Sequence, residues 1–348
     1  MTVAAGGWGI IGHDAAVAQL QRAVVTGLVP HALLLTGPAG VGKSTLAQAF
    51  VCALCCVAPP APGQSCGACL ACRKIARGVH PDIQRFDLAS QAERAEKAGS
   101  KNTSMTIDTV RAVASAASMR PIEARWRVAI VDDAETMAGV AQEALLKTLE
   151  EPPRSMLLLL LCDDVEALLP TVRSRCQLLE LRPAPATAIV GLLIARGHDA
   201  DAAAVVAGLA GGSPGWALRA VDHSALLAER ERAVEQAVAW IAAGPYDRLV
   251  RAVTTGDGFA KSRAETMDRL GMLLAVWRDA LLMTAGRRER MTFIRHAATL
   301  ATLGSGWTLD AVMQAVRSVQ VCMSDLDGNV RPRLALEAMV LQWPNPRA

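Results

Sequence analysis

Apolar residues run together in three short stretches of the first half of the chain, residues 32–36, 127–133 and 155–162. Residues 83–87 are a further strand candidate, although only Ile83 and Phe86 are apolar. Continuous apolar runs of this length are typical of strands that are covered on both faces of a sheet. Between them, residues 107–119 and 138–149 carry apolar side chains at helical spacing. This alternation predicts a parallel α/β sheet with crossover helices.

The pattern changes after two pairs of prolines. Pro152 and Pro153 end a helix, because proline lacks the amide proton and biases its neighbour away from helix. Two further prolines in residues 181–187 mark a domain boundary, and the rest of the chain has a helical pattern. We therefore expect an α/β domain over 1–183, a small helical domain over 184–245 and a larger C-terminal helical domain over 246–348.

Composition and charge agree with this division and exclude some classes of protein. A chain of 348 residues suits two or three domains. The net charge of +3 is too small to indicate nucleic-acid binding by itself. The N-terminus lacks the pattern of a signal peptide, and the apolar run at Met156–Cys162 is far shorter than the roughly 20 residues of a membrane helix. We expect a soluble, cytoplasmic protein that makes no membrane contact.

A glycine-rich loop lies between the first predicted strand and a predicted helix. Its glycines would let backbone amides approach phosphate oxygens, Lys43 would contact the outer phosphates and Ser44 a magnesium ion. A glycine-rich turn without a ligand is the alternative. The predicted phosphate loop comprises Gly37, Pro38, Ala39, Gly40, Val41, Gly42, Lys43, Ser44 and Thr45.

Asp132 follows the apolar run that begins at Arg127. An acidic residue at the end of a strand near a phosphate loop can hold the magnesium shell of a nucleotide. The alternative is a carboxylate that merely caps a turn. We predict that Asp132 and Ser44 hold the magnesium of bound ATP or ADP.

Cysteines cluster after the helix of the phosphate loop. Cys66, Cys69 and Cys72 have CxxCxxC spacing, and Cys55 and Cys56 precede them by about ten residues. Four thiolates in a small loop-rich segment suit a closed tetrahedral zinc site, for which we favour Cys56 as the fourth ligand. An iron-sulfur cluster or a set of buried thiols remains the alternative.

Together these motifs resemble the AAA+ ATPases, and among them the clamp-loader subunits of the bacterial replicative polymerase. The resemblance covers about residues 8–343. It implies an AAA+ module with a zinc-binding insertion, a helical lid over 184–245 and an oligomerising collar over 246–348. The residues that carry it are the stretches GVHPDIQRFD at 78–87, ALLKTLEEPP at 144–153, TVRSRC at 171–176 and NVRPRLALEAMVLQW at 329–343.

Within this family the chain is more similar to delta prime members than to the ATP-hydrolysing gamma/tau motors. The HPD and RSRC motifs are of the delta prime type, and the chain ends at 348, whereas tau carries long extra domains. An active motor subunit stays an alternative, and a P-loop small-molecule kinase is a remote one that has no use for the helical C-terminus.

Three departures from a motor bear on hydrolysis. Asp133 stands where the resemblance implies a catalytic glutamate, and Asp163 and Asp164 replace a polar sensing residue. Gly215 stands where a lid arginine is implied. Carboxylates near the phosphates would repel them. We therefore expect the chain to bind ATP or ADP with magnesium but to hydrolyse it weakly or not at all.

The resemblance also implies a role across a subunit boundary. The arginine of the SRC motif, Arg175, would reach a neighbouring subunit's nucleotide as an arginine finger. The alternative is that Arg175 only pairs with a local acid. The implied partners are gamma/tau and delta subunits, the sliding clamp and, through the complex, primed DNA, with this chain as the stationary member.

Overall fold

A computed structural model describes residues 8–94, 104–328 and 330–345. The chain forms two compact units, and each is described by itself. The first comprises Met1–Gly197 and Gly212–Trp216, and the second comprises His198–Gly211 and Ala217–Ala348. The three-domain division made from the sequence stays a prediction.

The first unit is built on a parallel sheet with the strand order β2-β3-β4-β1-β5. All four strand pairings are parallel, as the continuous apolar runs predict. The α/β class is therefore confirmed. The sequence indicated four of these strands and missed β5 at the edge. The strands are β1 (Ala32–Thr36), β2 (Ile83–Phe86), β3 (Arg127–Val131), β4 (Met156–Cys162) and β5 (Gln177–Glu180).

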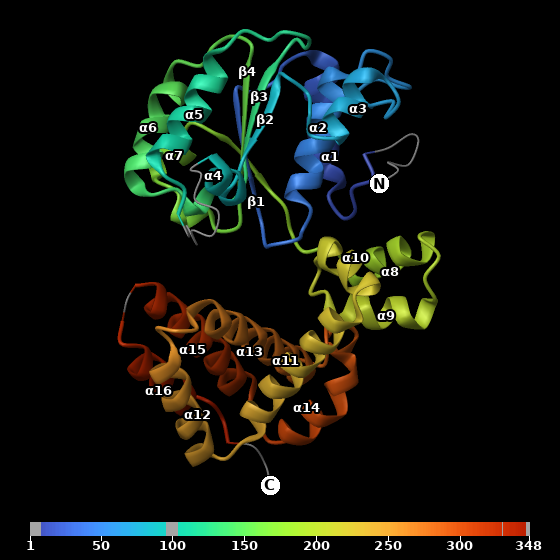
Figure 1. Ribbon diagram of the computed structural model, residues 1–348. Coiled ribbons are helices and arrows are strands. Elements are labelled where there is room, and N and C mark those ends of the chain that lie inside the picture. Colours follow the sequence, from blue (N-terminus) through green and yellow to red (C-terminus); the bar gives the residue numbers. More distant parts are fainter. Residues whose placement is uncertain (1–7, 95–103, 329, 346–348) are drawn as a thin grey trace. The chain divides into compact units, whose positions relative to one another are not determined.

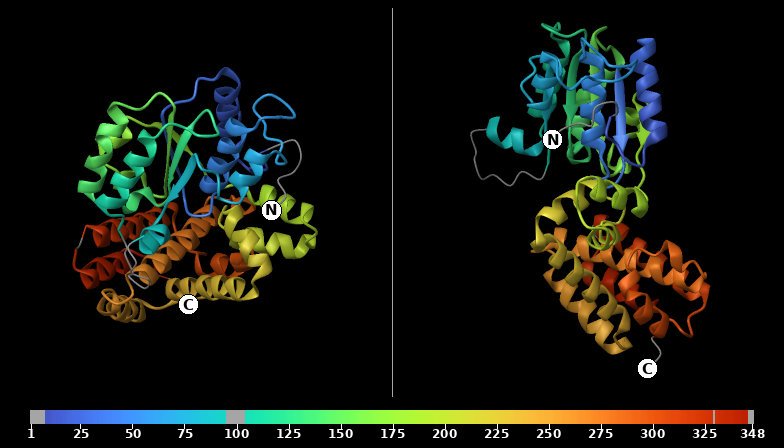
Figure 2. Two further views of the ribbon diagram at one scale, coloured as in Figure 1. Left: turned by 45° about the horizontal axis from the view of Figure 1, so that its top comes forward. Right: turned by 90° about the vertical axis from the view of Figure 1, so that its right-hand side faces the viewer.

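Helices cover both faces of this sheet. In Figure 1, α5, α6 and α7 lie on one side of the strands and α1, α2 and α3 on the other, and the left view of Figure 2 shows the same two layers. The predicted helices 107–119 and 138–149 correspond to α5 and α6. The helices of this unit are α1 (Asp14–Thr26), α2 (Lys43–Cys55), α3 (Leu70–Ala76), α4 (Leu88–Arg94), α5 (Ile107–Ser118), α6 (Gly139–Glu150), α7 (Pro170–Arg173) and α8 (Ala186–Ala195).

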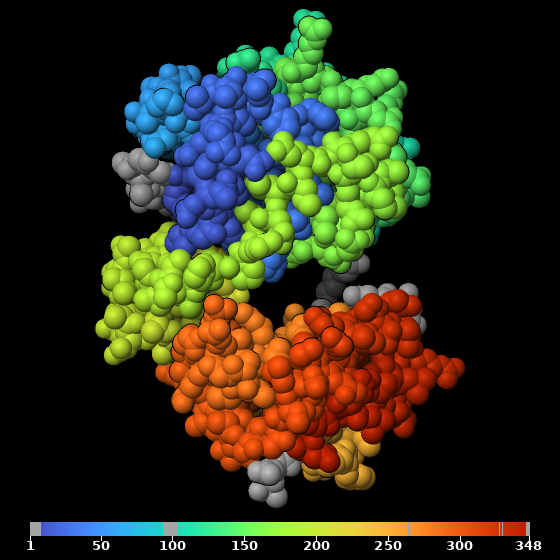
Figure 3. All heavy atoms as spheres, turned by 180° about the vertical axis from the view of Figure 1, so that it is seen from behind, coloured from blue at the N-terminus to red at the C-terminus, as the bar shows by residue number. Residues whose placement is uncertain are grey.

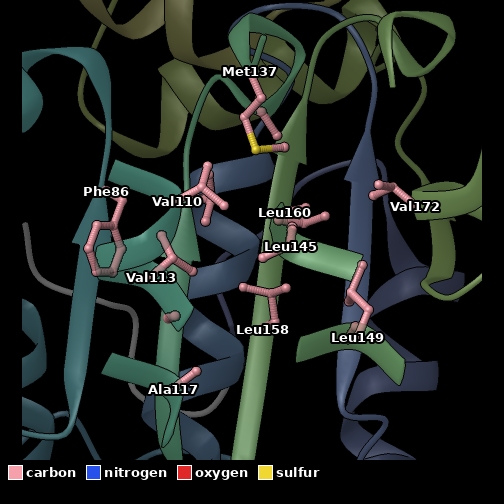
Figure 4. Packing of buried hydrophobic residues seen from close by; sticks show 14 of the residues in the cluster. Phe86, Val110, Val113, Ala117, Met137, Leu145, Leu149, Leu158, Leu160 and Val172 are labelled. Atoms are coloured by element: carbon pink, nitrogen blue, oxygen red, sulfur yellow. The ribbon is translucent and has the colours of Figure 1, made fainter. Parts of the chain in front are cut away.

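The central strand β4 explains why the sheet needs both layers. Successive side chains of a strand point to opposite faces. Leu158 and Leu160 accordingly join the core beneath α5 and α6, where Val113 and Leu145 meet them (Figure 4). Leu159 joins the opposite core cluster, which contains residues of α1 and α2. Every residue of β4 is buried, so the strand reads as an unbroken apolar run.

The second unit is helical, as the pattern after residue 187 predicts. Helix α10 (Pro214–Asp222) begins in the first unit's segment and continues into this one. The space-filling view shows the later helices, in orange and red, as one continuous body (Figure 3). The other helices are α9 (Ala200–Leu209), α11 (Ser224–Ala242), α12 (Pro245–Gly258), α13 (Arg263–Thr284), α14 (Ala297–Leu303), α15 (Leu309–Asp327) and α16 (Pro332–Leu341).

Tryptophans form the centre of this unit. Trp277 of α13 is fully buried, and its ring lies 5.2 Å from that of Trp307 and 5.4 Å from that of Trp343. The guanidinium of buried Arg248 stacks on Trp343 at 5.4 Å and donates to the Pro344 carbonyl at 2.9 Å. These contacts hold the residues after α16 against α12 and α13. The stretch 329–343 singled out in the sequence contains α16, and its first residue lies outside the described residues.

Across the described ranges, none of the helices combines the length and the apolar character that crossing a bilayer requires.

Candidate functional site

The strand order brings the chemistry-bearing residues to one edge of the sheet. Strand β4 lies between β3 and β1, and all three are parallel. Asp132 follows β3, Asp163 follows β4 and the phosphate loop follows β1. The carboxyl ends of parallel strands meet at the same edge, where open α/β sheets bind their ligands. The sequence motifs therefore converge in space.

The backbone of the loop requires glycine at its turning points. Gly37 has φ 144°, and a Cβ there would lie 2.1 Å from the carbonyl oxygen of Leu181. Gly40 has φ 73°, and a Cβ there would lie 2.3 Å from Ser213 Oγ. Gly42 has φ 119° and faces open space. The loop thus packs tightly at its base and leaves room at the N-terminus of α2. Of the other predicted loop residues, Val41 is buried, whereas Pro38, Ala39 and Thr45 are exposed.

Lys43 is held by the protein itself. Its side chain is only 9% exposed, and its ammonium group donates to the carbonyls of Gly37 at 2.6 Å and Pro38 at 3.2 Å. The same group forms an ion pair with the carboxylate of Asp163. The lysine that was predicted to contact outer phosphates therefore already contacts an anion of the chain.

The two predicted magnesium ligands, Ser44 and Asp132, both contact the guanidinium of Arg85. One terminal nitrogen of Arg85 donates both to Ser44 Oγ and to the carboxylate of Asp132. Arg85 reaches them from β2, and sequence reasoning missed it. Ser44 and Asp132 do lie close together, as magnesium ligands would. They do not fit magnesium while they hold the guanidinium, because a second cation would have to share the same oxygens.

Further carboxylates surround the two ion pairs. Asp133 adopts a left-handed backbone conformation with φ 53°, a conformation that Asp tolerates better than most residues. Burial raises the pKa of Asp133, and the charges of Asp132, Asp163 and Asp87 raise it further. Glu135 accepts a hydrogen bond from the Asp163 amide at 3.1 Å, and burial raises its pKa as well. This part of the edge is acidic.

Gly215, which stands where the resemblance implies a lid arginine, also contacts the phosphate loop. The amide of Gly215 donates to the carbonyl oxygen of Gly40 at 3.0 Å. A Cβ at Gly215 would lie 3.0 Å from that oxygen, so a side chain there would crowd the loop. Segment 212–216 thus contacts the phosphate loop through backbone and brings no cation from residue 215.

Four cysteines meet beside α2 and α3. The sulfur atoms of Cys56, Cys66, Cys69 and Cys72 all lie within 4.8 Å of one another. The amides of Cys66, Cys69 and Cys72 donate to the sulfur of the preceding member of the set, at 3.2, 3.2 and 3.5 Å. This convergence of four thiols fits a tetrahedral metal such as zinc.

The two candidates for the fourth ligand differ in their surroundings. Cys55 is buried in the core cluster beneath α1 and α2, and burial raises the pKa of its thiol to about 12. Cys56 points into the set of four. Within that set, the Cys69 amide lowers the pKa of Cys66 to about 6, which favours the thiolate that a metal needs. Cys56 is therefore the cysteine of the pair whose position fits a metal.

Arg175 lies after α7, close to the end of α6. Its guanidinium pairs with the carboxylate of Glu150 at 2.8 Å and donates to the Thr171 carbonyl at 3.0 Å. Its side chain is 36% exposed. Within this chain Arg175 therefore does pair with a local acid, and part of its surface stays accessible.

The relatives found by comparison with known proteins include delta' and gamma subunits of DNA polymerase III. The delta' subunit of DNA polymerase III from Pseudomonas aeruginosa is 37% identical over 187 residues, 53% of each chain. The delta' subunit from Escherichia coli is 37% identical over 191 residues, and the gamma subunit from Buchnera aphidicola (subsp. Schizaphis graminum) is 25% identical over 307 residues, 86% of this chain and 78% of the relative. The chain spans about half the length of the delta' relatives that it matches.

Solved structures resemble the chain only distantly. A gamma subunit-related protein of DNA polymerase III from Thermotoga maritima covers 94% of this chain and 97% of its own, with 15% identity and a TM-score of 0.35. That likeness is too weak to carry an argument.

Two family models match the chain in sequence order. Residues 12–185 match the family described as DNA polymerase III, delta subunit. Residues 229–345 match the family described as DNA polymerase III, delta subunit, C terminal. The first match alone spans half of the chain and contains the phosphate loop, the four cysteines and Arg175. The chain therefore belongs to the DNA polymerase III delta subunit family and is homologous to the delta' subunits of the clamp loader.

Proposed function

We propose that the chain works as a delta prime-type stator of the bacterial clamp loader. It would assemble with gamma/tau and delta subunits in the cytoplasm and take part in loading the sliding clamp onto primed DNA. The AAA+ module, the lid and the collar of the sequence analysis would provide its three domains, with zinc in the set of four cysteines.

This proposal rests on the residues that stand at the positions of a motor's hydrolytic groups. Asp163 pairs with Lys43 where a motor would need a polar sensing residue, and residue 215 brings no cation to the loop. Asp133, in the place of the catalytic glutamate, sits among other carboxylates that raise its pKa. Each altered group removes stabilisation from a transition state, and every loss of about 1.4 kcal/mol slows a reaction about tenfold. A chain with these changes suits nucleotide binding better than turnover.

Its catalytic contribution would come from Arg175 in trans. Arginine fingers stabilise charge on the transferred phosphoryl group and contribute about 10³- to 10⁵-fold in rate. The partial exposure of Arg175 leaves its guanidinium accessible to a neighbour. Its ion pair with Glu150 is itself partly exposed, and such pairs contribute about 0–1 kcal/mol. Glu150 would therefore orient Arg175 without preventing its transfer to a phosphate.

Reconstitution with gamma/tau and delta subunits tests this role. In a single-turnover experiment, Arg175→Ala should remove hydrolysis at one nucleotide site while the complex still assembles by size-exclusion chromatography. Arg175→Lys should recover little, because lysine lacks the planar fork of guanidinium. Arg111→Ala is the matched control, since Arg111 is an exposed arginine that pairs with Asp108. An unchanged hydrolysis trace for Arg175→Ala would contradict the role in trans.

The gamma relative, which matches over most of both chains, favours a second candidate: an active motor subunit in which Asp133 serves as the base. Steady-state hydrolysis separates the two candidates. The isolated chain should release phosphate no faster than its Lys43→Ala variant if it is a stator. A rate that matches gamma/tau and depends on Lys43 would identify a motor.

A further inference from the structure

We propose that Arg85 and Asp163 make the phosphate loop a site for a nucleoside diphosphate that is free of magnesium. Arg85 takes the place of the metal, and Asp163 takes the place of the terminal phosphate. This inference rests on the proposed nucleotide binding and narrows its ligand.

The first argument is the position of Arg85. Its terminal nitrogen contacts Ser44 Oγ and the Asp132 carboxylate, the two groups that a nucleotide's magnesium would need. A guanidinium carries a permanent charge and cannot give up its proton. Magnesium would therefore have to displace Arg85 or remain beside another cation. Arg85 instead offers N–H donors directly to phosphate oxygens, which guanidinium binds well.

The backbone around Arg85 makes this placement a property of the fold. In the parallel ladder, Arg85 of β2 pairs with Ile130 of β3, two residues before Asp132. The amide of Asp132 also donates to the Phe86 carbonyl at 2.8 Å. The strand that presents the arginine is thus hydrogen-bonded to the segment that presents the carboxylate. The backbone of Arg85 cannot move far while β2 and β3 stay paired, and from there its side chain reaches Ser44 and Asp132.

The second argument is the engagement of Lys43. A terminal phosphate would need the ammonium group that Asp163 and two loop carbonyls now hold. It would also approach Asp133 and Glu135, which lie near Asp163. Lys43 and Arg85 are already paired with Asp163 and Asp132, so they offset that repulsion only in part. A diphosphate held on the loop amides would lack the phosphate that meets this repulsion.

The loop is uncrowded at Gly42, beside the N-terminus of α2. Gly42 has no atom within 4 Å of the position of a Cβ, and the neighbouring helix α2 has 13 residues. The N-terminus of a helix of this length favours an anion through its free amides and its dipole. The side chains of Lys43 and Ser44 contact Asp163 and Arg85, and no atom lies within 4 Å of a Cβ placed at Gly42.

Calorimetric titration of the full chain with ADP and ATP, each with magnesium or with EDTA, tests the proposal. ADP should bind equally well in both conditions, and ATP should bind at least about tenfold more weakly, the effect of one charge-assisted contact. Gly37→Ala should remove the binding of both nucleotides, because the added Cβ would lie 2.1 Å from the Leu181 carbonyl oxygen and distort the loop amides, which locates the ligand on this loop.

Two substitutions separate the roles of the internal ions. Arg85→Gln should weaken ADP binding in EDTA by about tenfold or more and make it dependent on magnesium, since one charged donor is lost. Asp163→Asn should strengthen ATP binding until it approaches that of ADP. Arg111→Gln and Asp108→Asn are the matched controls, because these residues form an exposed ion pair with each other. Circular dichroism at the titration temperature verifies that each variant is folded, and Arg85→Lys repeats the test with the charge retained.

Three results would overturn the proposal. One is a wild-type ADP affinity that rises about tenfold with magnesium, the signature of an ordinary metal-nucleotide site. The second is an Arg85→Gln variant whose response to magnesium equals that of wild type. The third is a chain that binds neither nucleotide. The third result removes the ligand but leaves the role of Arg175 in trans untouched, so this proposal and the proposed function fail separately.

Discussion

A buried carboxylate in the HPD motif provides the sharpest test of how the sheet is held together. Asp82 is fully buried, and its two oxygens accept the amides of Ile122, Glu123 and Ala124, each at 2.7 Å. Arg127, at the start of β3, lies 3.4 Å away and is also buried. Asp82 thus connects the turn before β2 to the loop that leads into β3 through three hydrogen bonds.

The loss of folding stability in Asp82→Ala follows from the polar groups that lose their partner. Three amides lose a charged acceptor, and Arg127 loses its nearest anion. Arg127 keeps three other acceptors, the carbonyls of Pro81 at 2.5 Å and Ala116 at 3.0 Å and the sulfur of Met119 at 3.7 Å. The side chain of Ile122 is 77% exposed, so water can reach part of the vacated loop. Removing one partner of a buried ion pair typically costs about 3–5 kcal/mol, and the exposure of the loop places this case near the lower end.

Hydrogen exchange measures this cost where it arises. Amides of β3 should exchange about 100-fold faster or more in Asp82→Ala, since each 1.36 kcal/mol corresponds to tenfold. Asp108→Ala is the matched control: its carboxylate is 83% exposed and pairs with Arg111 at 3.1 Å. The control should change exchange by less than about tenfold, because exposed pairs contribute about 0–1 kcal/mol. Equal exchange rates in the two variants would refute the conclusion that Asp82 stabilises the loop before β3.

The same carboxylate predicts the direction of the acid response. Burial by itself raises the pKa of Asp82. Hydrogen bonds from the amides of Ala124, Ile122 and Glu123 lower it by more than burial raises it, so the net pKa is lowered. A folded pKa below the unfolded pKa stabilises the protein fully above the unfolded value, about 3.9 for Asp, and this stabilisation is lost as the pH falls through the folded pKa. The free energy of unfolding should therefore fall below about pH 4 more steeply in wild type than in Asp82→Ala. Parallel pH profiles would contradict this reading.

Two further predictions concern the loop and the metal set. Gly37→Ala should prevent nucleotide binding and destabilise the first unit, because the added Cβ would lie 2.1 Å from the Leu181 carbonyl oxygen at φ 144°; thermal unfolding compared with Gly42→Ala, which faces open space, measures the steric part. Cys69→Ser should reduce bound zinc in a metal assay to well below one per chain, whereas Cys55→Ser, outside the set, should retain it; equal zinc content in both variants would contradict the assignment.

The sequence predicted every strand that is buried on both faces, and of the two edge strands it indicated β2 but missed β5. Strands β1, β3 and β4 are buried at every position, so their sequences are continuous apolar runs. Strand β5 is exposed at three of its four positions, and its residues QLLE carry no such run. An edge strand of this length takes its structure from pairing with β1 rather than from its own sequence. That pairing is long-range and leaves no local signal.

The site shows the same division between local and long-range information. The loop glycines and Lys43 are local, because spacing alone specifies a turn and a helix start. Arg85 is different: a single charged residue in IQRF gives no sign of its partners until the register of β2 against β3 is known. The sequence left open whether Arg175 pairs with a local acid, and the structure shows that it pairs with Glu150. The role across a subunit boundary depends on a second chain and stays a prediction.

The internal ion pairs would explain how the proposed lack of turnover is compatible with a complete phosphate-loop sequence. Lys43 is nine-tenths buried, and a buried ammonium group needs an anion whether or not a nucleotide is present. In a motor that anion is the phosphate, so the empty loop bears an unpaired charge and gains stability when the ligand binds. Here Asp163 supplies the anion permanently. The loop residues then contribute to folding in the empty state, and the free energy that a nucleotide could gain from Lys43 is reduced by the ion pair it must break. Under the proposed function, the presence of the motif and its weak catalysis would therefore have the same physical cause.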